Sequence, residues 1–507
     1  MTGFAQAIAQ GYAVEGLALD LGRGIHEGKL EPEAVVRVPL ATTNRHGLIA
    51  GATGTGKTKT LQVLTEQLSA AGVPVFAADV KGDVSGLVHP AEAGGPAEER
   101  MRELGLPFEP SGFPVEFFSL GGIGPGVPIR ATVSDFGPQL LAKVLKSNET
   151  QEQSLALVFR YADQNGLPLL DLADLRALLT YLDSDAGKES LRGIGGVSSA
   201  TIGVLLRSLV SVEDGGGNEF FGEPQLDIAD LLRTAPDRRG IVSCLELAAA
   251  QDKPELFSTV MMWLLAELFE TLPEVGDVEK PKLVFFFDEA HLLFDDATEA
   301  FLDSVVKTVR LIRSKGVGVY FVTQQPTDIP RDVLAQLGNR VQHALRAFTP
   351  EDAEALRKTV RTYPKSEFYD LETLLTSVGI GEAAVTILSE TGVPTPVVHT
   401  RMRAPASRMD VADDIAGAAQ ASPLFARYGA RVDSQSAREV LAARLEQSSA
   451  PPPAPAPPSK RNREAADAVG RGGDPLTDFL SSRQGQTLQR EILRGMFGLL
   501  RRPRRGF

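Results

Sequence analysis

Cysteine is almost absent from this chain of 507 residues, and the single Cys244 has no partner for an internal disulfide. One cysteine also excludes a cysteine cluster that binds a metal. Because its neighbours in 241–245 are mostly apolar, we expect Cys244 to be a buried strand residue. His46 and His291 do not stand in a Cys/His ligand pattern, so the sequence predicts no zinc site.

Long apolar runs are also missing. The longest, Val260–Ala266, is far shorter than the ~20 residues that cross a bilayer. The first ten residues lack the basic start and apolar centre of a signal peptide. With 43% apolar and 23% charged residues, the composition is that of a globular protein, and we expect it to be soluble and cytoplasmic.

Positive charge is in deficit, since the formal net charge is −13. This balance argues against a protein that coats nucleic acid over its whole surface. It leaves room for a local basic strip or pore, because physiological salt screens charges beyond ~8 Å.

What the chain does contain is the octapeptide Gly51-Ala-Thr-Gly-Thr-Gly-Lys-Thr58. An apolar run over 47–50 precedes it, and a helical pattern over 59–68 follows it. A strand, a glycine loop and a helix N-terminus together direct backbone N–H groups and the helix dipole at one anion. An ordinary glycine-rich turn is the alternative, but the flanking elements favour a phosphate-binding loop.

Each residue type in this loop has a physical role in binding ATP. Gly51, Gly54 and Gly56 allow close approach of the backbone to phosphate. Lys57 would reach the β- and γ-phosphates, and the Thr58 hydroxyl would ligate Mg²⁺. The candidate ATP-binding residues are Gly51, Ala52, Thr53, Gly54, Thr55, Gly56, Lys57, Thr58 and Lys59.

A second signal is the apolar run that ends in Asp288 and Glu289. An all-apolar strand belongs in the middle of a parallel sheet, and such sheets bind ligands at the carboxyl ends of their strands. We expect Asp288 to hold the Mg²⁺ opposite Thr58 and Glu289 to act as general base on the attacking water. The alternative is that these two acids only begin the next helix. We expect His291 to pack at the nucleotide side of that helix.

A third signal is the apolar run 317–322, which ends in polar residues. A strand beside the acidic one can present a polar side chain to the γ-phosphate. Gln324 is the first candidate for this sensing role and Thr323 is the second.

Several arginines are candidates for stabilising the transferred phosphoryl group from a neighbouring subunit. Arg310 and Arg313 lie largely off the apolar stripe of a helix expected over 299–313. Arg340 and Arg346 compete for the same role, and a solvated helix face is the plain alternative. Spacing alone does not decide between them.

The order of the segments indicates an α/β protein. The strand, loop, helix and strand over 47–79 form a βαβ unit, which predicts a mainly parallel sheet. We expect an N-terminal segment with possible strands (1–40), an ATPase core in two parts (41–131 and 239–405), a helical insertion between them (132–238), a helical segment (406–449), a proline-rich linker (450–475) and a basic amphipathic tail helix (476–507).

The tail has an unusual composition. Six of the eight residues of 451–458 are proline, and 460–507 holds eleven basic and five acidic residues, or about +6. Apolar residues recur every fourth position from Leu488 to Leu500. Such a helix could contact a membrane surface, nucleic acid or a protein partner. A solvated tail with one weakly docked helix is the alternative.

With these motifs placed, the chain resembles the HerA/FtsK superfamily of hexameric, DNA-pumping P-loop ATPases, and more narrowly the bacterial HerA-like (YjgR-type) family. The resemblance covers roughly 41–405. The stretches that carry it are 44–58, 73–83, 220–230, 282–294, 312–324 and 337–350.

The resemblance implies a RecA-like core, ATP hydrolysis at subunit interfaces and a homo-oligomeric, hexameric ring. By its position Asp79 matches an acidic site residue of such ATPases, and Arg313 matches an arginine that acts across the interface. The chain departs from that pattern in two places. Its first forty residues are too few for the N-terminal β-barrel of HerA-type translocases, and DNA pumping does not explain the helical insertion.

Three functions follow from this reading. The first is an ATP-driven motor that acts on DNA. The second is a non-motor ATPase switch that controls a protein partner through the insertion or the tail. The third is membrane association through 485–505, as in conjugative coupling proteins.

Overall fold

The computed structural model describes residues 3–191, 193, 195–276, 278–294 and 299–449. Almost all of the described residues belong to one compact unit, Met1–Gln447. The expected linker over 450–475 and the expected basic helix over 476–507 lie outside the described residues. Within the described part of the chain, every helix is too short or too polar to span a bilayer.

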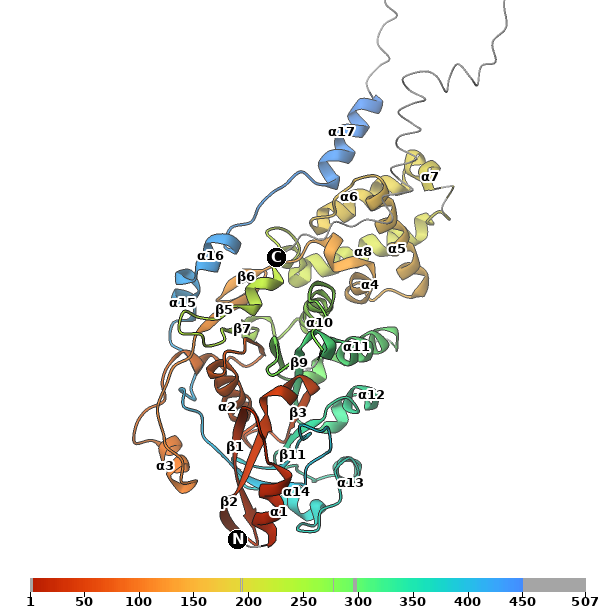
Figure 1. Cartoon of the computed structure of the whole chain (residues 1–507). Coiled ribbons are helices and arrows are strands. Elements are labelled where there is room, and N and C mark those ends of the chain that lie inside the picture. The colour runs from red at the N-terminus through yellow and green to blue at the C-terminus, as the bar shows by residue number, and fades with distance from the viewer. Residues whose placement is uncertain (1–2, 192, 194, 277, 295–298, 450–507) are drawn as a thin grey trace, which may run out of the picture. The chain divides into compact units, whose positions relative to one another are not determined.

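One sheet of twelve strands organises the first unit (Figure 1). The strands are β1 (Ala18–His26), β2 (Lys29–Pro39), β3 (Gly47–Ala50), β4 (Val75–Asp79), β5 (Val115–Leu120), β6 (Val127–Ile129), β7 (Val242–Glu246), β8 (Leu283–Phe287), β9 (Val317–Thr323), β10 (Asn339–Gln342), β11 (Glu382–Thr386) and β12 (Val398–Met402).

The strand order is β2-β1-β12-β11-β10-β3-β9-β8-β4-β7-β5-β6. All pairs from β10 to β6 are parallel, and all pairs from β10 to β2 are antiparallel. Every residue of β3, β4, β8 and β9 is buried, as a central parallel strand requires. The expected mainly parallel α/β core is confirmed.

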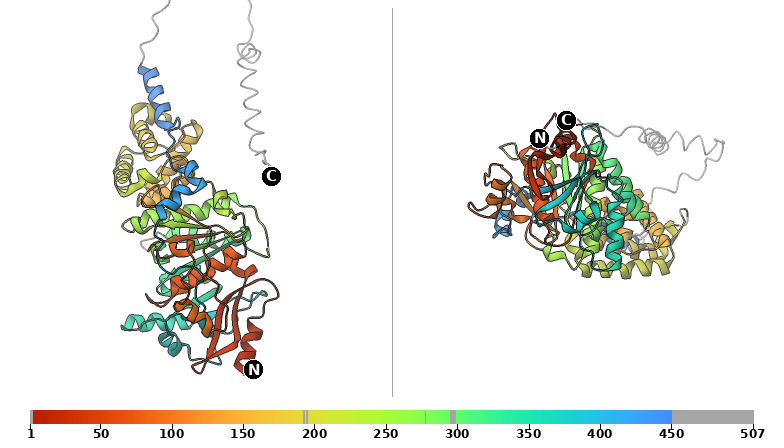
Figure 2. Two further views of the ribbon diagram at one scale, coloured as in Figure 1. Left: turned by 90° about the vertical axis from the view of Figure 1, so that its left-hand side faces the viewer. Right: turned by 90° about the horizontal axis from the view of Figure 1, so that it is seen from below.

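The helices flank this sheet (Figure 2). They are α1 (Gly3–Gly11), α2 (Lys57–Ala70), α3 (Pro96–Glu103), α4 (Val133–Val144), α5 (Glu149–Gln164), α6 (Leu172–Asp183), α7 (Asp185–Leu191), α8 (Ser199–Val212), α9 (Asn218–Phe220), α10 (Pro254–Thr271), α11 (Glu299–Ile312), α12 (Arg331–Leu334), α13 (Pro350–Val360), α14 (Leu371–Ser377), α15 (Ile415–Ala421), α16 (Pro423–Tyr428) and α17 (Ala437–Ser449).

The side chains of alternate residues in the central strands belong to two separate hydrophobic clusters, one on each face of the sheet. Phe285 and Phe287 of β8 belong to the cluster that contains α10 and α11. Val284 and Phe286 belong to the cluster that contains α1 and α2. The two faces are therefore covered by different helices, which form a three-layer arrangement around the sheet.

The segment between β6 and β7 is helical, with α4 to α9 between Val133 and Phe220. Its buried leucines belong to the same cluster as α10 and the β8 side chains. Figure 1 shows α4 to α8 gathered together next to α10. The insertion is therefore joined to the core by continuous apolar packing rather than by a flexible tether.

The N-terminal segment, expected over 1–40 with possible strands, contains β1 and β2. β1 pairs with β12 and β2 pairs with β1, so residues 18–39 extend the same sheet that carries the phosphate loop. The turn at Glu27–Gly28 joins the two strands with positive φ at both residues. The sequence did not indicate that these strands join the main sheet, because β1 pairs with β12, more than 370 residues later in the chain.

Candidate nucleotide-binding site

The octapeptide 51–58 forms a tight loop between β3 and α2, and α2 begins at Lys57. Gly51, Gly54 and Gly56 have φ of 153°, 78° and 117°, a region that side chains disfavour. A Cβ on Gly51 would lie 2.5 Å from the Cβ of His343. The loop therefore needs glycine both for its backbone angles and for its close contact with the strand end.

Lys57 of the loop and Lys59 directly after it have carbonyl partners within the protein. The Lys57 ammonium donates to the Ala52 carbonyl at 3.3 Å, and burial lowers the pKa of Lys57. The Lys59 ammonium donates to the Met409 carbonyl, so it reaches the segment that follows β12. Lys57 is thus directed into the loop that would hold phosphate. Lys59 is directed to the segment that follows β12.

Three carboxylates lie together at the carboxyl ends of β4 and β8. One oxygen each of Asp79, Asp83 and Asp288 lies within 4.8 Å of the others. Asp79 accepts backbone hydrogen bonds from Gly82 and Val84, both at 2.8 Å, so it also holds the loop after β4. Asp288 Oδ2 and Asp83 Oδ1 are buried and have no hydrogen-bond partner among the described residues.

These unpartnered oxygens fit a divalent cation that prefers oxygen ligands. Burial, and after it the Glu289 charge, raises the pKa of Asp288 to about 7. A bound cation would remove this penalty by supplying the missing positive charge. The expected ligand Asp288 is suitable in burial and position, and Asp83 joins it, whereas the oxygens of Asp79 are largely occupied by amides.

Glu289 follows Asp288 in a left-handed backbone conformation with φ of 47°. Its side chain is 7% exposed, and its Oε1 forms an ion pair with the Lys81 ammonium. Its Oε2 lies 3.4 Å from His291 Nδ1. The candidate base is therefore buried at the carboxyl ends of the strands, where the phosphate loop also lies. It stands between the Lys81 ammonium and the His291 ring.

The candidate sensing residues occupy the end of β9, the strand between β3 and β8. Thr323 is buried and its hydroxyl donates to Asp328 Oδ2 at 2.6 Å. Gln324 is exposed directly beyond the strand. The structure therefore favours Gln324 over Thr323 as the side chain that can reach a phosphate.

The candidate arginines lie at different ends of the parallel strands. Some lie at the carboxyl ends, where the phosphate loop is, and others lie at the amino ends. Arg346 follows β10 on the phosphate-loop edge, because β10 runs parallel to β3. Arg340 donates to the carbonyls of Leu337 and Thr362 at 3.1 and 2.9 Å. Arg313 precedes β9 and therefore lies at the opposite edge from the phosphate loop of its own chain.

A basic pocket of about 530 Å³ lies at the amino ends of these strands. Arg45, Arg310, Arg313 and Arg340 contribute to its lining. Arg310 and Arg313 therefore lie at the end of the sheet opposite the phosphate loop, and Arg340 is held there by carbonyls of its own chain.

Sequence reasoning missed three residues of the site. Glu246 ends β7 as the register partner of Asp79, and burial raises the pKa of Glu246 to about 7. Asp83 belongs to the acidic group described above, and Lys81 holds Glu289. The signal that was available for Glu246 is the acid that ends an otherwise uncharged strand, 241–246.

His343 also supports the loop. It follows β10, and its Nε2 lies 2.9 Å from Thr60 Oγ1 while its Nδ1 lies 2.7 Å from the Glu382 carbonyl. Burial lowers the pKa of His343 to about 4, so the ring is neutral at pH 7. Its two ring nitrogens therefore connect α2 to β11, and its Cβ lies against Gly51.

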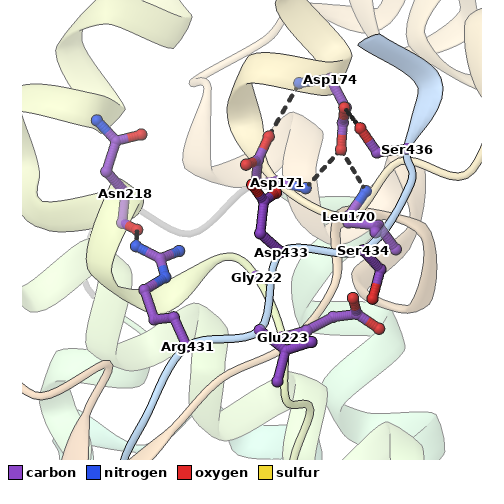
Figure 3. A pocket seen from close by; sticks show the side chains of 11 residues that line it. Leu170, Asp171, Asp174, Asn218, Gly222, Glu223, Arg431, Asp433, Ser434 and Ser436 are labelled. Carbon is purple, nitrogen blue, oxygen red and sulfur yellow. Dashed lines mark hydrogen bonds between the residues drawn. The ribbon is translucent and has the colours of Figure 1, made fainter. Parts of the chain in front are cut away.

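A second polar pocket of about 320 Å³ lies between the insertion and the segment after α16 (Figure 3). Asp174 accepts hydrogen bonds from the amides of Leu170 and Asp171 and from the Ser436 hydroxyl. Arg431 donates to the Asn218 carbonyl. These contacts attach the segment after α16 to the insertion, so the pocket residues have a structural role.

A phosphate loop on a mainly parallel RecA-like sheet, with acids at the neighbouring strand ends, defines the class of P-loop NTPases. Comparison with known proteins narrows this class. A family model described as helicase HerA-like C-terminal matches residues 25–505. The chain belongs to this HerA-like family.

Solved structures agree with the fold. The unbound monoclinic form of the bacterial conjugative coupling protein TrwBΔN70 has a TM-score of 0.52 at 14% identity and covers 80% of this chain and 95% of its own. TrwB in complex with ADP and Mg²⁺ has a TM-score of 0.51 at 14% identity, with 80% and 95% covered.

VirB4 of Thermoanaerobacter pseudethanolicus has a TM-score of 0.49 at 16% identity, with 77% and 98% covered. The comparison with curated proteins gave no match. The expected membership of the HerA/FtsK group and the RecA-like fold are confirmed.

Proposed function

We propose that this protein is an ATP-hydrolysing motor ATPase that binds ATP with Mg²⁺ and acts on DNA as a ring of identical subunits. The observation that carries the proposal is the meeting of Lys57, Asp288 and Glu289 at one sheet edge, with Arg313 at the other. A subunit arranged in this way holds the nucleotide at one edge and offers an arginine at the opposite one. TrwB, a fold relative, was crystallised with ADP and Mg²⁺ and with a non-hydrolysable ATP analogue.

Each side chain has a defined role in this proposal. The loop amides and Lys57 bind the β- and γ-phosphates, and Thr58, Asp288 and Asp83 hold Mg²⁺. Mg²⁺ would neutralise charge on the phosphate oxygens. Glu289 accepts a proton from the attacking water.

Three further residues act around the γ-phosphate or support its site. Gln324 orients the water or senses the γ-phosphate. Asp79 positions the loop that bears Asp83. Arg313 reaches the γ-phosphate of the adjacent subunit, where it would stabilise charge in the transition state.

The first experiment measures ATP hydrolysis by the full chain with and without Mg²⁺, beside the Lys57→Ala variant. We expect Mg²⁺-dependent turnover by the wild type and loss of nucleotide binding in the variant. Equal turnover by both proteins would refute the site assignment.

The second experiment addresses DNA. We expect single- or double-stranded DNA to stimulate turnover, and raising the salt concentration to weaken that stimulation, because phosphate contacts release counterions. A turnover rate that DNA leaves unchanged would favour the second candidate, an ATPase switch for a protein partner. The observation that favours that candidate is the large helical insertion, which carries none of the site residues named above.

A further inference from the structure

The candidate general base is already engaged by a side chain that the proposed reaction does not use. Lys81 Nζ forms an ion pair with Glu289 Oε1. The Lys81 side chain is 42% exposed, whereas that of Glu289 is 7% exposed. The ion pair occupies one of the two oxygens that would accept a proton from water, so this contact restrains the base.

The position of Lys81 is set by the loop that bears it. The Asp79 carboxylate accepts hydrogen bonds from the amides of Lys81, Gly82 and Val84 at 3.3, 2.8 and 2.8 Å. Gly82 has a φ of 80°, which closes the turn. The ammonium is therefore presented by a loop that is tied to the end of β4.

Lys81 also interacts electrostatically with Lys57 of the phosphate loop and with the acids at the strand ends. Burial opposes its charge, but Glu289, Asp288 and Asp83 outweigh this and raise the pKa of Lys81. The charge of Lys81 in turn contributes to lowering the pKa of Lys57, after burial, so the two ammoniums lie in one electrostatic environment. A triphosphate held by Lys57 would compete with Glu289 for the half-exposed ammonium of Lys81.

We propose that Lys81 is a nucleotide-responsive positioning residue that holds Glu289 in the nucleotide-free protein. When ATP binds, the ammonium moves to the γ-phosphate, and the Glu289 carboxylate becomes free to accept a proton from water. The proposal rests on the proposed ATPase function. ADP lacks the γ-phosphate, so ADP leaves Lys81 on Glu289.

The first test compares Lys81→Met, which removes the charge, with Lys81→Arg, which keeps it. We expect Lys81→Met to weaken binding of a non-hydrolysable ATP analogue about tenfold and to leave ADP binding within about twofold. We expect Lys81→Arg to restore most of the analogue affinity. Lys358→Met, at a surface ion pair on α13, is the matched control and should change neither affinity.

The second test is a double-mutant cycle with Glu289→Gln. In the presence of Lys81, this change should tighten analogue binding, because the ammonium no longer has to leave a carboxylate. In the Lys81→Met background it should have no effect on analogue binding. Additive effects would overturn the proposal, since they would show only that Glu289 repels the γ-phosphate directly.

Failure of this inference can be told apart from failure of the proposed function. A wild type that binds no ATP and hydrolyses none refutes the ATPase itself. A wild type that hydrolyses ATP, with a Lys81→Met variant that loses ADP and analogue affinity equally, refutes only the role of Lys81. Unchanged thermal unfolding of Lys81→Met would show that the protein is folded in either case.

Discussion

Glu289 combines burial, a left-handed backbone and a cationic partner at the end of the central strand β8. We predict that Glu289→Gln keeps ATP binding and lowers turnover by about 10²–10⁴-fold, the usual share of general base catalysis. Equilibrium binding of nucleotide and single-turnover hydrolysis measure the two effects separately. Normal turnover in the variant would transfer the role of base to another residue.

Two buried histidines make stability depend on pH. Burial lowers the pKa of His46 and of His343 to about 4, below the ordinary value near 6.5. Between these values the unfolded chain binds more protons than the folded one, so the free energy of unfolding decreases as the pH falls from about 6.5 to about 4. The loss is up to about 3 kcal/mol for each histidine.

We predict that replacement of His46 by asparagine reduces this pH dependence. His46 Nδ1 accepts a hydrogen bond from the Val319 amide at 3.0 Å, and the asparagine Oδ1, which occupies the same position in the side chain, can accept in its place without titrating. Thermal unfolding at pH 7 and at pH 4.5 gives the comparison. A pH dependence identical to that of the wild type would show that other groups dominate acid unfolding.

At the scale of elements, the helix that begins in the phosphate loop is tied to the segment after β12. Glu66 of α2 accepts hydrogen bonds from the amides of Ala406 and Ser407, both at 2.9 Å. The same segment reaches Lys59 through the Met409 carbonyl. Residues far apart in the chain therefore set how rigidly α2 and the loop are held.

We predict that Glu66→Ala lowers the free energy of unfolding by about 2–4 kcal/mol, because it leaves one buried and one part-buried amide without their acceptor. Chemical denaturation with a matched Glu33→Ala control, at an exposed position of β2, measures the effect. A loss as small as that of the control would mean that water replaces the carboxylate.

The elements also show where sequence patterns suffice. The loop 51–58 and the apolar strands β8 and β9 were predicted from short stretches, because their roles follow from local residue order. The antiparallel extension by β1 and β2, and the pairing of Glu246 with Asp79, were missed. Both depend on strand neighbours, which no local pattern encodes.

For the whole molecule, we propose that the site is completed between subunits. Lys57 lies at the carboxyl ends of the central strands and Arg313 lies at their amino ends. A head-to-tail arrangement would therefore bring the arginine of one copy to the loop of the next. Such a contact closes into a ring when the rotation between copies allows it.

We predict that Arg313→Ala and Lys57→Ala each abolish turnover alone and regain it when mixed. In random mixtures about a quarter of head-to-tail interfaces would combine an intact loop with an intact arginine. Steady-state ATPase assays of the mixture, with Arg310→Ala in place of Arg313→Ala as the control, test this. Absence of recovery, with assembly confirmed by native mass measurement, would refute action in trans.

The sequence by itself determined the nucleotide-binding class, because the glycine loop and the acidic strand each act through neighbours in the chain. Only the tertiary structure decided which groups share the site. It brought Lys81 to Glu289 and Asp83 to Asp288, and it separated Arg313 from Lys57 by the length of the strands. The physical reason is that charges interact through space, over a few ångströms that sequence distance does not report.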